Sequence, residues 1–238
     1  MEGYPSRSRR LVRAVVYGVL VVIPLAALAY LVRTQFGPLI RLDQHVSVTA
    51  TDFARSHPGF RSFAETWELI SQPWVVYAVL GLPVCAFAYF HLHLRTRALW
   101  ALATMATGWA VAVVLKELVQ RSRPAIEDPF STHSGYSFPS GHATNNAIVI
   151  TLVLLLLRPA LGTTSRTVLL VVGALWVLVT CADRLVMGAH YLSDVIAGVV
   201  LGCGLCLASY AGYLGWSPPT TDTPSKKESL DGVSHPVG

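Results

Sequence analysis

With 238 residues, 53% of them hydrophobic and only 13% charged, the chain falls well short of the roughly 25% charge of a typical soluble domain. This balance excludes a soluble globular protein, a disordered chain and a disulfide scaffold, and it favours an integral membrane protein. The net charge of +5 does not indicate nucleic-acid binding, because the one basic cluster, residues 7–13, directly precedes an apolar run and is typical of a cytoplasmic anchor beside anionic lipid.

Six apolar runs are long enough, or nearly so, to cross a bilayer as helices, which takes about 20 residues because the hydrocarbon core is roughly 30 Å thick. They are Ala14–Val32, Trp74–Leu94, Ala98–Leu115, Ala143–Leu157, Thr167–Met187 and Tyr191–Leu214. The runs are continuously apolar and lack the alternation of membrane-barrel strands. We therefore predict an all-α integral membrane protein, a six-helix bundle whose short fourth helix begins with polar residues.

The first run has an alternative interpretation as an export signal. It follows Arg9 and Arg10 and contains the sequence Ala27-Leu28-Ala29, which resembles a cleavage site. The run is longer than most signal cores, and we therefore expect a membrane helix that is retained.

One long polar connection, Thr34–Pro73, joins the first two runs. Two sets of mainly apolar residues recur in it at helical spacing: Leu42, Val46, Thr49 and Phe53, and then Phe60, Phe63, Trp67 and Ile70. Segments of this kind lie in the membrane interface or pack on the bundle. A role in admitting substrate is an alternative.

Lys and Arg counts orient the predicted bundle, because cytoplasmic loops carry the excess of these residues. With the N-terminus inside, ten of the 18 basic residues are cytoplasmic. We therefore predict a multi-pass protein of the plasma membrane with a cytoplasmic basic N-terminus at 1–13 and a single six-helix membrane domain at 14–215. An extracytoplasmic loop is expected at about 34–73, and a disordered cytoplasmic tail rich in Pro, Ser, Thr and Lys at 216–238.

Many of the remaining charged residues gather in three motifs at the ends of predicted helices, all on the extracytoplasmic side. The motifs are Lys116-Glu-Leu-Val-Gln-Arg-Ser-Arg123-Pro124, then Phe138-Pro139-Ser140-Gly141-His142, and then Asp183-Arg184-Leu-Val-Met-Gly-Ala-His190-Tyr-Leu-Ser-Asp194. Charged groups at membrane depth are costly, so we expect them to face the bundle interior and to mark a functional site. Taken singly, such cations could also be interfacial anchors.

The cations of these motifs suit a phosphate group. Lys116, Arg123 and Arg184 are not balanced by comparable acids, and an Arg fork grips phosphate oxygens in pairs. Ser140 and Gly141 open a helix, whose free N–H groups and positive dipole end favour an anion. Glycine also allows the backbone to approach a ligand closely.

Two histidines and one carboxylate supply the chemistry of phosphate transfer. His190 and Asp194 are four residues apart, so on a helix they share a face. Asp194 can accept a hydrogen bond from one ring nitrogen and leave the other as a nucleophile. His142, from another helix, can then protonate the leaving oxygen.

The spacings Lys116-x6-Arg123-Pro124, Pro139-Ser140-Gly141-His142 and Arg184-x5-His190-x3-Asp194 resemble the signature of the type 2 phosphatidic acid phosphatase (PAP2) superfamily. The resemblance implies a PAP2/haloperoxidase-like core and a phosphatase of lipid phosphates or diphosphates that uses no metal and no cofactor. It implies that His190 forms a phosphohistidine, with Asp194 as its partner and His142 as the acid. Lys116, Arg123, Ser140, Gly141 and Arg184 would then hold the phosphate.

The chain departs from the family pattern at Asp183, where the family usually has serine. An acid beside the phosphate clamp would weaken phosphate binding or orient Arg184. Between the first two motifs, Glu127, Asp128, His133 and Tyr136 are either solvated loop residues or substrate contacts.

The predicted partners are a lipid phosphate substrate and the bilayer, without nucleic acid. Phosphatidic acid, phosphatidylglycerophosphate and undecaprenyl diphosphate are the alternatives for the substrate, because the motifs read only the phosphate. Two other functions stay open: a vanadate-dependent haloperoxidase, which shares the signature but is soluble, and a non-enzymatic transporter or lipid-binding protein with a phosphate site.

Overall fold

The computed structural model describes residues 7–126 and 134–213, and within these ranges it is helical with no strand. The helices are α1 (Arg7–Arg33), α2 (Gly37–Ser56), α3 (Pro58–Ile70), α4 (Pro73–Val76), α5 (Leu82–Phe90), α6 (Arg95–Val119), α7 (Gly141–Leu157), α8 (Thr163–Val186) and α9 (Leu192–Tyr213). A π-helical turn, Tyr77–Gly81, joins α4 to α5, and a 3-10 turn, Arg158–Ala160, follows α7. The all-α prediction is confirmed.

All six predicted membrane spans are helices in the structure. Six segments of the described chain are long and apolar enough to cross a membrane: Ser8–Arg33, Pro73–Phe90, Arg95–Val119, Gly141–Ala160, Thr163–Val186 and Leu192–Tyr213. The second span is composite, since α4, the π-helical turn and α5 run on from one another. Residues 1–6, the loop residues Glu127, Asp128 and His133, and the predicted tail at 216–238 lie outside the described residues.

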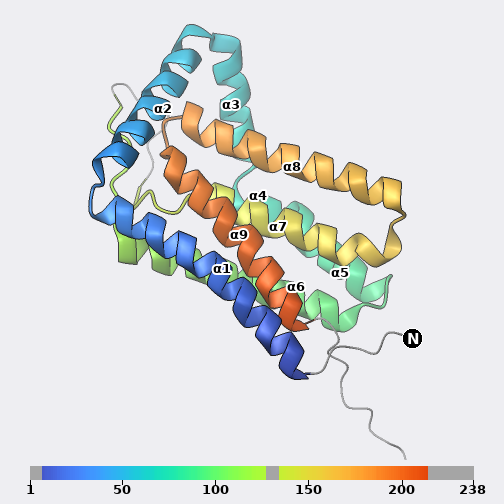
Figure 1. Cartoon of the computed structure of the whole chain (residues 1–238). Helices are drawn as coiled ribbons and strands as arrows, with labels where there is room; N and C mark the ends of the chain where they lie inside the picture. Colours follow the sequence, from blue (N-terminus) through green and yellow to red (C-terminus); the bar gives the residue numbers. More distant parts are fainter. Residues whose placement is uncertain (1–6, 127–133, 214–238) are drawn as a thin grey trace, which may run out of the picture.

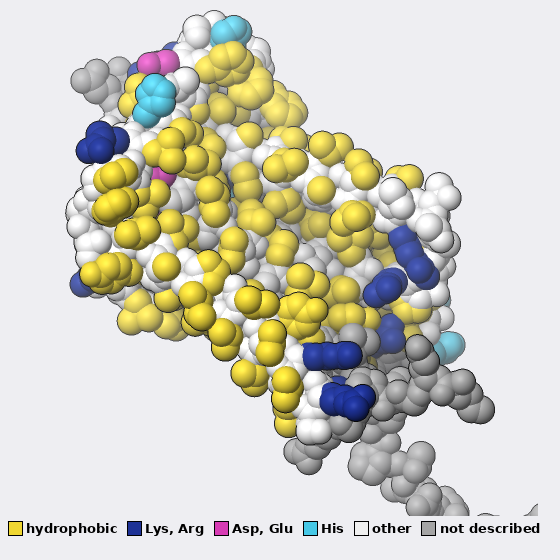
Figure 2. Space-filling model, in the orientation of Figure 1, with side chains coloured by type: hydrophobic (Ala, Val, Ile, Leu, Met, Phe, Trp, Pro, Cys, Tyr) yellow, Lys and Arg dark blue, Asp and Glu magenta, His cyan; other side chains and the backbone are white. Residues whose placement is uncertain are grey.

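The bundle is organised around α7, which lies between α6, α8 and α9, while α1 packs along the far side of α9 (Figure 1). More than half of the α7 span is buried inside the protein, a larger share than in any of the other five spans. On the face shown in Figure 2, hydrophobic side chains cover much of the surface. This is the surface expected of helices whose solvent is lipid.

Close packing of α9 on α7 depends on two glycines four residues apart. A Cβ atom at Gly198 would lie 2.8 Å from the Ser140 carbonyl oxygen, and one at Gly202 would lie 2.6 Å from that of Thr144. Both distances are too short for carbon, so larger residues would push the helices apart. This GxxxG spacing allows close helix contact, as it commonly does in membrane helices, and it brings the start of α7 against the start of α9.

Buried polar side chains also fix α7 in the bundle. The amide oxygen of Asn145 accepts a hydrogen bond from the Tyr77 hydroxyl (2.5 Å), and that of Asn146 accepts one from the Trp176 indole (2.6 Å). In a membrane each unsatisfied polar group is expensive, so these bonds favour one rotational setting of α7. His142 and Ser140, at its N-terminal end, are set by the same rotation.

The connection between the first two spans folds into two helices, α2 and α3, which form a hairpin beside the end of the bundle (Figure 1). Helices were predicted there, but the apolar stripe is not the buried face of α2. Leu42 and Phe53 are 49% and 46% exposed. The buried residues of α2 are small or polar: Asp43, Ser47, Thr51 and Ala54. The reason is tertiary, because an ion pair draws Asp43 inward (below).

The two ends of the bundle differ in charge. One end holds the start of α1 and the 91–94 and 158–162 connections, and Figure 2 shows several Lys and Arg side chains gathered there. The other end holds residues 34–36, 120–126, 134–140 and 187–191 of the connections, together with α2 and α3. All three sequence motifs lie at this second end.

Candidate active site

The site forms where the end of α6 meets the beginnings of α7 and α9. α6 ends at Gln120, whose left-handed backbone (φ 52°) directs its N–H to the Lys116 carbonyl at 2.9 Å. The chain then turns back over the bundle, and the N–H of Ser137 holds it there by donating to the Arg121 carbonyl at 2.9 Å. This turn carries Arg121 and Arg123 to the site.

His190 lies in the turn between α8 and α9. The sequence placed it on the last helix with Asp194, but α9 begins only at Leu192. The physical reason is a helix cap: the Asp194 carboxylate accepts the N–H of Tyr191 at 2.9 Å, which starts the helix after the histidine. Gly188, with φ 66°, completes the turn in a conformation that glycine adopts readily.

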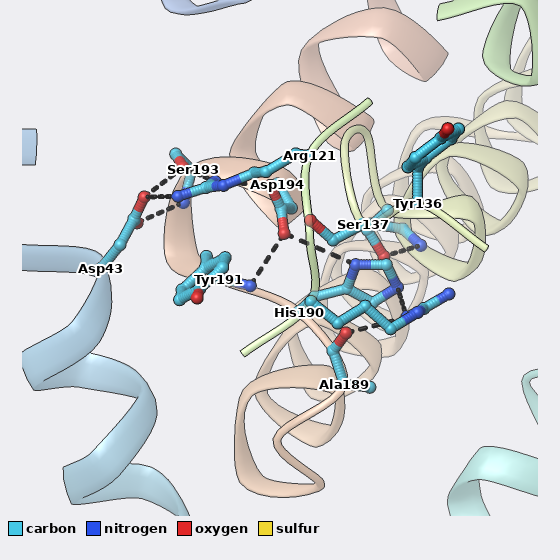
Figure 3. Close-up of polar contacts among 12 residues, drawn as sticks. Asp43, Arg121, Tyr136, Ser137, Ala189, His190, Tyr191, Ser193 and Asp194 are labelled. Atoms are coloured by element: carbon cyan, nitrogen blue, oxygen red, sulfur yellow. Dashed lines mark hydrogen bonds and ion pairs between the residues drawn. The ribbon is translucent and has the colours of Figure 1, made fainter. Parts of the chain in front are cut away.

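His190 and Asp194 nevertheless face each other. His190 Nδ1 lies 3.6 Å from Asp194 Oδ2, which is longer than the hydrogen-bond range of about 2.7–3.2 Å but close enough for an ion pair. Both residues are buried, at 3% and 0% exposure. Asp194 is itself held from the side, since its Oδ1 accepts a hydrogen bond from Arg121 Nη1 at 2.6 Å (Figure 3).

Arg123 lies at the opposite edge of the imidazole ring. Its Nη1 is 3.4 Å from His190 Nε2 and also donates to the Ala189 carbonyl at 2.8 Å. Because a guanidinium can only donate, this contact assigns the lone pair to Nε2 and the proton to Nδ1. The lone pair of Nε2 then faces a cation, while Nδ1–H points toward the carboxylate.

The environment of His190 keeps its ring neutral. Burial is the main reason that the pKa of His190 is lowered to about 4; the cations of Arg123 and Lys116 lower it further, whereas the Asp194 carboxylate opposes them. The usual value is about 6.5. At neutral pH the imidazole is therefore unprotonated at Nε2, which is the form a nucleophile requires.

The first turn of α7 is joined directly to the first turn of α9. The N–H of Ser140 donates to the Asp194 carbonyl at 3.0 Å, and the Ser140 hydroxyl caps α7 by accepting the Ala143 N–H at 3.4 Å. A Cβ added at Gly141 would meet no protein atom within 4 Å, so packing within the protein does not require glycine there. His142 follows in the same turn of α7.

Lys116 and Arg123 are both engaged by the segment that precedes α7. Lys116 Nζ donates to the Tyr136 carbonyl at 2.7 Å, and Arg123 Nε donates to the Gly135 carbonyl at 3.1 Å. Tyr136, one of the loop residues that the sequence singled out, thus accepts a hydrogen bond through its backbone carbonyl from Lys116, which is predicted to bind phosphate. Neither cation is paired with a carboxylate in these contacts, so both keep positive charge available for an anion.

Arg184 is placed differently from the other two predicted cations. It is fully buried, and its Nε donates to Asp183 Oδ2 at 2.8 Å while Nη1 donates to Glu68 Oε1 at 2.9 Å. Its Nη2 also bonds to Asp183. Of the two effects predicted for Asp183, orientation of Arg184 is therefore visible in the structure, and the carboxylate of Glu68 adds a second acid.

Sequence reasoning missed three buried charged residues: Asp43, Glu68 and Arg121. Asp43 and Glu68 lie on the long connection, in helices that were predicted from their apolar residues, and Arg121 lies inside the first motif but was not predicted as a site residue. A usable signal was present in α2, where Asp43, Ser47, Thr51 and Ala54 recur every three or four residues. Such a stripe of small and polar residues permits close helix contact, so it marks an alternative buried face.

The described part of the chain contains no group of three or more His, Cys, Asp or Glu side chains arranged to hold a metal ion. The arrangement of described residues instead offers a neutral imidazole with a carboxylate behind it, three nearby cations and a helix N-terminus. Together they can bind an anion and attack it with nitrogen. The structure brings all eight predicted site residues to one end of the bundle, and their individual roles stay predictions.

Comparison with known proteins identifies relatives of this arrangement. Residues 97–217, about half of the chain, match the sequence model of the PAP2 superfamily. A solved transmembrane PAP2-type phosphatidylglycerolphosphate phosphatase from Bacillus subtilis superposes with a TM-score of 0.71 at 22% identity, covering 81% of this chain and 93% of that chain. The likeness supports the fold of a multi-pass membrane bundle.

Three curated relatives align with the chain. Phosphatidylglycerophosphatase B of Bacillus subtilis is 31% identical over 56% of this chain and 73% of that protein. Decaprenylphosphoryl-5-phosphoribose phosphatase of Mycobacterium tuberculosis is 36% identical over 54% of this chain and 65% of that protein. Lipid A 1-phosphatase of Rhizobium johnstonii is 36% identical over 44% of this chain and 43% of that protein. Their names share one feature, a phosphate carried by a lipid.

Proposed function

The chain belongs to the PAP2 superfamily, and we propose that it is an integral membrane phosphatase that hydrolyses lipid phosphate monoesters or diphosphates through a phosphohistidine. Membership and the names of the relatives make it a hydrolase of phosphate esters. The observation that carries the mechanism is the orientation of His190, whose Nε2 is 3.4 Å from Arg123 and whose Nδ1 is 3.6 Å from Asp194.

In the proposed first step, Nε2 of His190 attacks phosphorus and the bond between phosphorus and the lipid oxygen breaks. His142 gives its proton to that oxygen, so the lipid leaves as an alcohol, or as a monophosphate when the substrate is a diphosphate. The positive charge that develops on the imidazole is stabilised by Asp194. Lys116, Arg123, Arg184 and the N-terminus of α7 would hold the phosphoryl oxygens.

In the second step, water attacks the phosphohistidine, and His142 takes up the proton that water loses. The N–P bond breaks, inorganic phosphate leaves, and both histidines return to their starting states. No step in this sequence requires a metal. We therefore expect the reaction to proceed in EDTA.

The substrate is proposed at the level of chemical class. The three relatives are named for a glycerophosphate lipid, a polyprenyl-linked phosphoribose and lipid A, which differ in everything but the membrane-anchored phosphate. Phosphatidylglycerophosphate, phosphatidic acid and undecaprenyl diphosphate are thus the first substrates to compare.

Phosphate release from these lipids, with purified protein in detergent and EDTA, tests the proposal. His190→Ala should abolish release, whereas His91→Ala, which changes an exposed histidine at the other end of the bundle, should not. Radiolabelled substrate quenched during turnover should leave an acid-labile, alkali-stable phosphate on the wild-type protein alone. Full turnover by His190→Ala would reject the mechanism, and binding of lipid without phosphate release would support the transporter alternative.

We also propose that the site faces the extracytoplasmic side, because Lys and Arg favour a cytoplasmic N-terminus. Two matched substitutions test this orientation. Ser56→Cys lies at the site end of the bundle and Ser165→Cys at the other end, and both serines are exposed. A membrane-impermeant maleimide added to intact cells should label Ser56→Cys only; the reverse pattern would place the site in the cytoplasm.

A further inference from the structure

Two buried residues that were not among the predicted site residues, Asp43 and Arg121, are connected to the proposed nucleophile through Asp194. We propose that Arg121, anchored by Asp43, is a positioning residue that fixes the Asp194 carboxylate behind His190. The inference rests on the proposed function, because Arg121 acts here through the partner of the nucleophile and touches no reacting atom.

The first step of the argument is a continuous chain of short contacts. Arg121 Nη1 donates to Asp194 Oδ1 at 2.6 Å, and Nη2 donates to Asp43 Oδ2 at 2.6 Å. Figure 3 shows Arg121 lying between the two carboxylates, with His190 on the far side of Asp194. Side chains from α2, from the turn after α6 and from α9 are thereby linked in one line.

The Asp43 carboxylate is in turn held by the helix that carries Asp194. Its Oδ1 accepts the N–H of Ser193 at 2.9 Å, and its Oδ2 accepts the Ser193 hydroxyl at 2.5 Å. The same hydroxyl oxygen accepts a bond from Arg121 Nη1 at 2.7 Å. The three side chains therefore close a ring, and the position of Arg121 is determined from both sides.

The ring and the adjoining Asp194 are buried, so their charges cost more to desolvate than those of a surface ion pair. The side chains of Arg121, Asp43 and Asp194 are 4%, 1% and 0% exposed. Buried charges repay their desolvation only with good geometry and complete hydrogen bonding, so stability alone is a weak reason for the arrangement. The Arg121 guanidinium also stacks on Tyr191, with Cζ 4.0 Å from the ring centroid, next in sequence to His190.

The geometry of Asp194 shows what Arg121 controls. Arg121 donates to Oδ1 and the Tyr191 N–H donates to Oδ2, and these two bonds fix the plane of the carboxylate. In this orientation Oδ2 is the oxygen that faces His190 Nδ1. Without the guanidinium only the Tyr191 N–H would restrain rotation of the carboxylate about its Cβ–Cγ bond. Oδ2 lies 3.6 Å from Nδ1. A carboxylate of variable orientation would stabilise the positive imidazole less well across this distance.

Charge explains the need for Asp43. Asp43, Arg121 and Asp194 together carry one net negative charge, because one guanidinium lies between two carboxylates. This charge matches the positive imidazole that forms when Nε2 accepts a phosphoryl group. If Asp194 were the only acid, Arg121 would neutralise it and weaken its effect on His190. Asp43 thus shares the cation and leaves Asp194 an effective partner.

A substitution that separates positioning from a simple structural tie is Arg121→Gln. We expect kcat to fall about 10- to 100-fold, as for other residues that orient a catalytic group, with KM and inhibition by vanadate, a phosphate analogue, changed less than about threefold. The rate of phosphohistidine formation should fall with kcat. Arg121→Lys, which keeps the cation but loses the fork, should retain more of kcat than the Gln variant.

Arg33→Gln is the matched control. Arg33 Nη1 donates to the Val119 carbonyl at 3.1 Å, two residues before Arg121, but none of its described bonds reaches Asp43 or Asp194. It should keep wild-type kcat. Full kcat in Arg121→Gln, or an equal loss of kcat in Arg33→Gln, would overturn the proposal.

Because Arg121→Gln leaves two buried carboxylates without a cation, a charge-matched variant protects the test from misfolding. Asp43→Asn/Arg121→Gln keeps the summed charge of positions 43, 121 and 194 at minus one. Its kcat should equal that of Arg121→Gln, because both residues act along one line. A double variant with wild-type kcat would reject the role of Arg121.

Wild-type protein and His190→Ala, assayed beside these variants, separate the two levels of inference. Loss of phosphate release in His190→Ala with full activity in both Arg121 variants would reject positioning and leave the phosphatase proposal intact. Equal phosphate release by the wild type and His190→Ala would reject the proposed mechanism, and with it the positioning role.

Discussion

Arg121 and Arg184 are both buried arginines held between two carboxylates, one of which comes from the α2–α3 hairpin. Arg121 pairs with Asp43 of α2 and Asp194 of α9, and Arg184 pairs with Glu68 of α3 and Asp183 of α8. The difference lies in the second acid: Asp194 faces His190, the proposed nucleophile, whereas Asp183 accepts hydrogen bonds from Nε and Nη2 of the adjacent Arg184.

The comparison shows that similar ion pairs can serve different steps. At Arg121 the guanidinium orients the Asp194 carboxylate, which is the group that faces the histidine. At Arg184 the two carboxylates orient the guanidinium, which the family resemblance assigns to phosphate binding. Substitutions in the first cluster should therefore change kcat, and those in the second should change KM.

The largest effect is expected where the first cluster meets the nucleophile. Asp194→Asn should lower kcat about 10³- to 10⁴-fold, because the amide stabilises a positive imidazole poorly and can favour the wrong tautomer. Phosphate release under saturating substrate is the measurement. Asp52→Asn, which changes an exposed acid of α2, is the control, and a comparable loss there would remove the distinction.

In the second cluster, Arg184→Lys should raise KM about 10- to 100-fold with a smaller change in kcat. Lysine keeps the charge but cannot bind two oxygens as a fork. A complete kinetic curve for wild type and variant separates the two constants. If kcat fell and KM did not change, Arg184 would belong with Arg121 and the comparison would fail.

Glu68→Gln should act in the opposite direction and lower KM. It removes one acid that competes with phosphate for Arg184, and at a partly screened site such a charge is worth about 1 kcal/mol, or about threefold to tenfold in affinity. Asp43→Asn should lower kcat and leave KM unchanged. Vanadate inhibition constants for the two variants provide an independent check; weaker vanadate binding by Glu68→Gln would contradict the prediction.

The smallest effect is a shift of the pH profile. Since the pKa of His190 is lowered to about 4 and the neutral ring is the nucleophile, kcat/KM should stay high as pH falls to about 5 and decline through about pH 4. Arg121→Gln removes the cation that partly neutralises Asp194, so the carboxylate should raise the pKa of His190 and the decline should move to higher pH. Arg184→Lys keeps its charge and should not move it. A decline near pH 6.5 in the wild type would show that burial does not control this histidine.

Sequence alone was sufficient for the membrane bundle and for the resemblance to the family. Each span is a continuous apolar run because lipid contacts it on most sides, so composition and length determine its existence with little help from neighbours. Motif spacing likewise survives folding, since Lys116 and Arg123, Ser140 and Gly141, and His190 and Asp194 are each close in sequence. The exact start of α9 was missed because it depends on a cap that Asp194 makes with its own carboxylate.

The tertiary structure decided which side of α2 is buried and which charges meet. Asp43 and Arg121 are 78 residues apart in sequence, and Arg184 and Glu68 are 116 apart, so no local pattern relates them. The sequence left open whether Leu42 and Phe53 lie in the membrane interface or pack on the bundle, and both are exposed. An exposed apolar side chain costs little beside a membrane, whereas an unpaired buried arginine costs much. The ion pairs therefore set the rotation of α2, and the acids around the proposed active site follow from that choice.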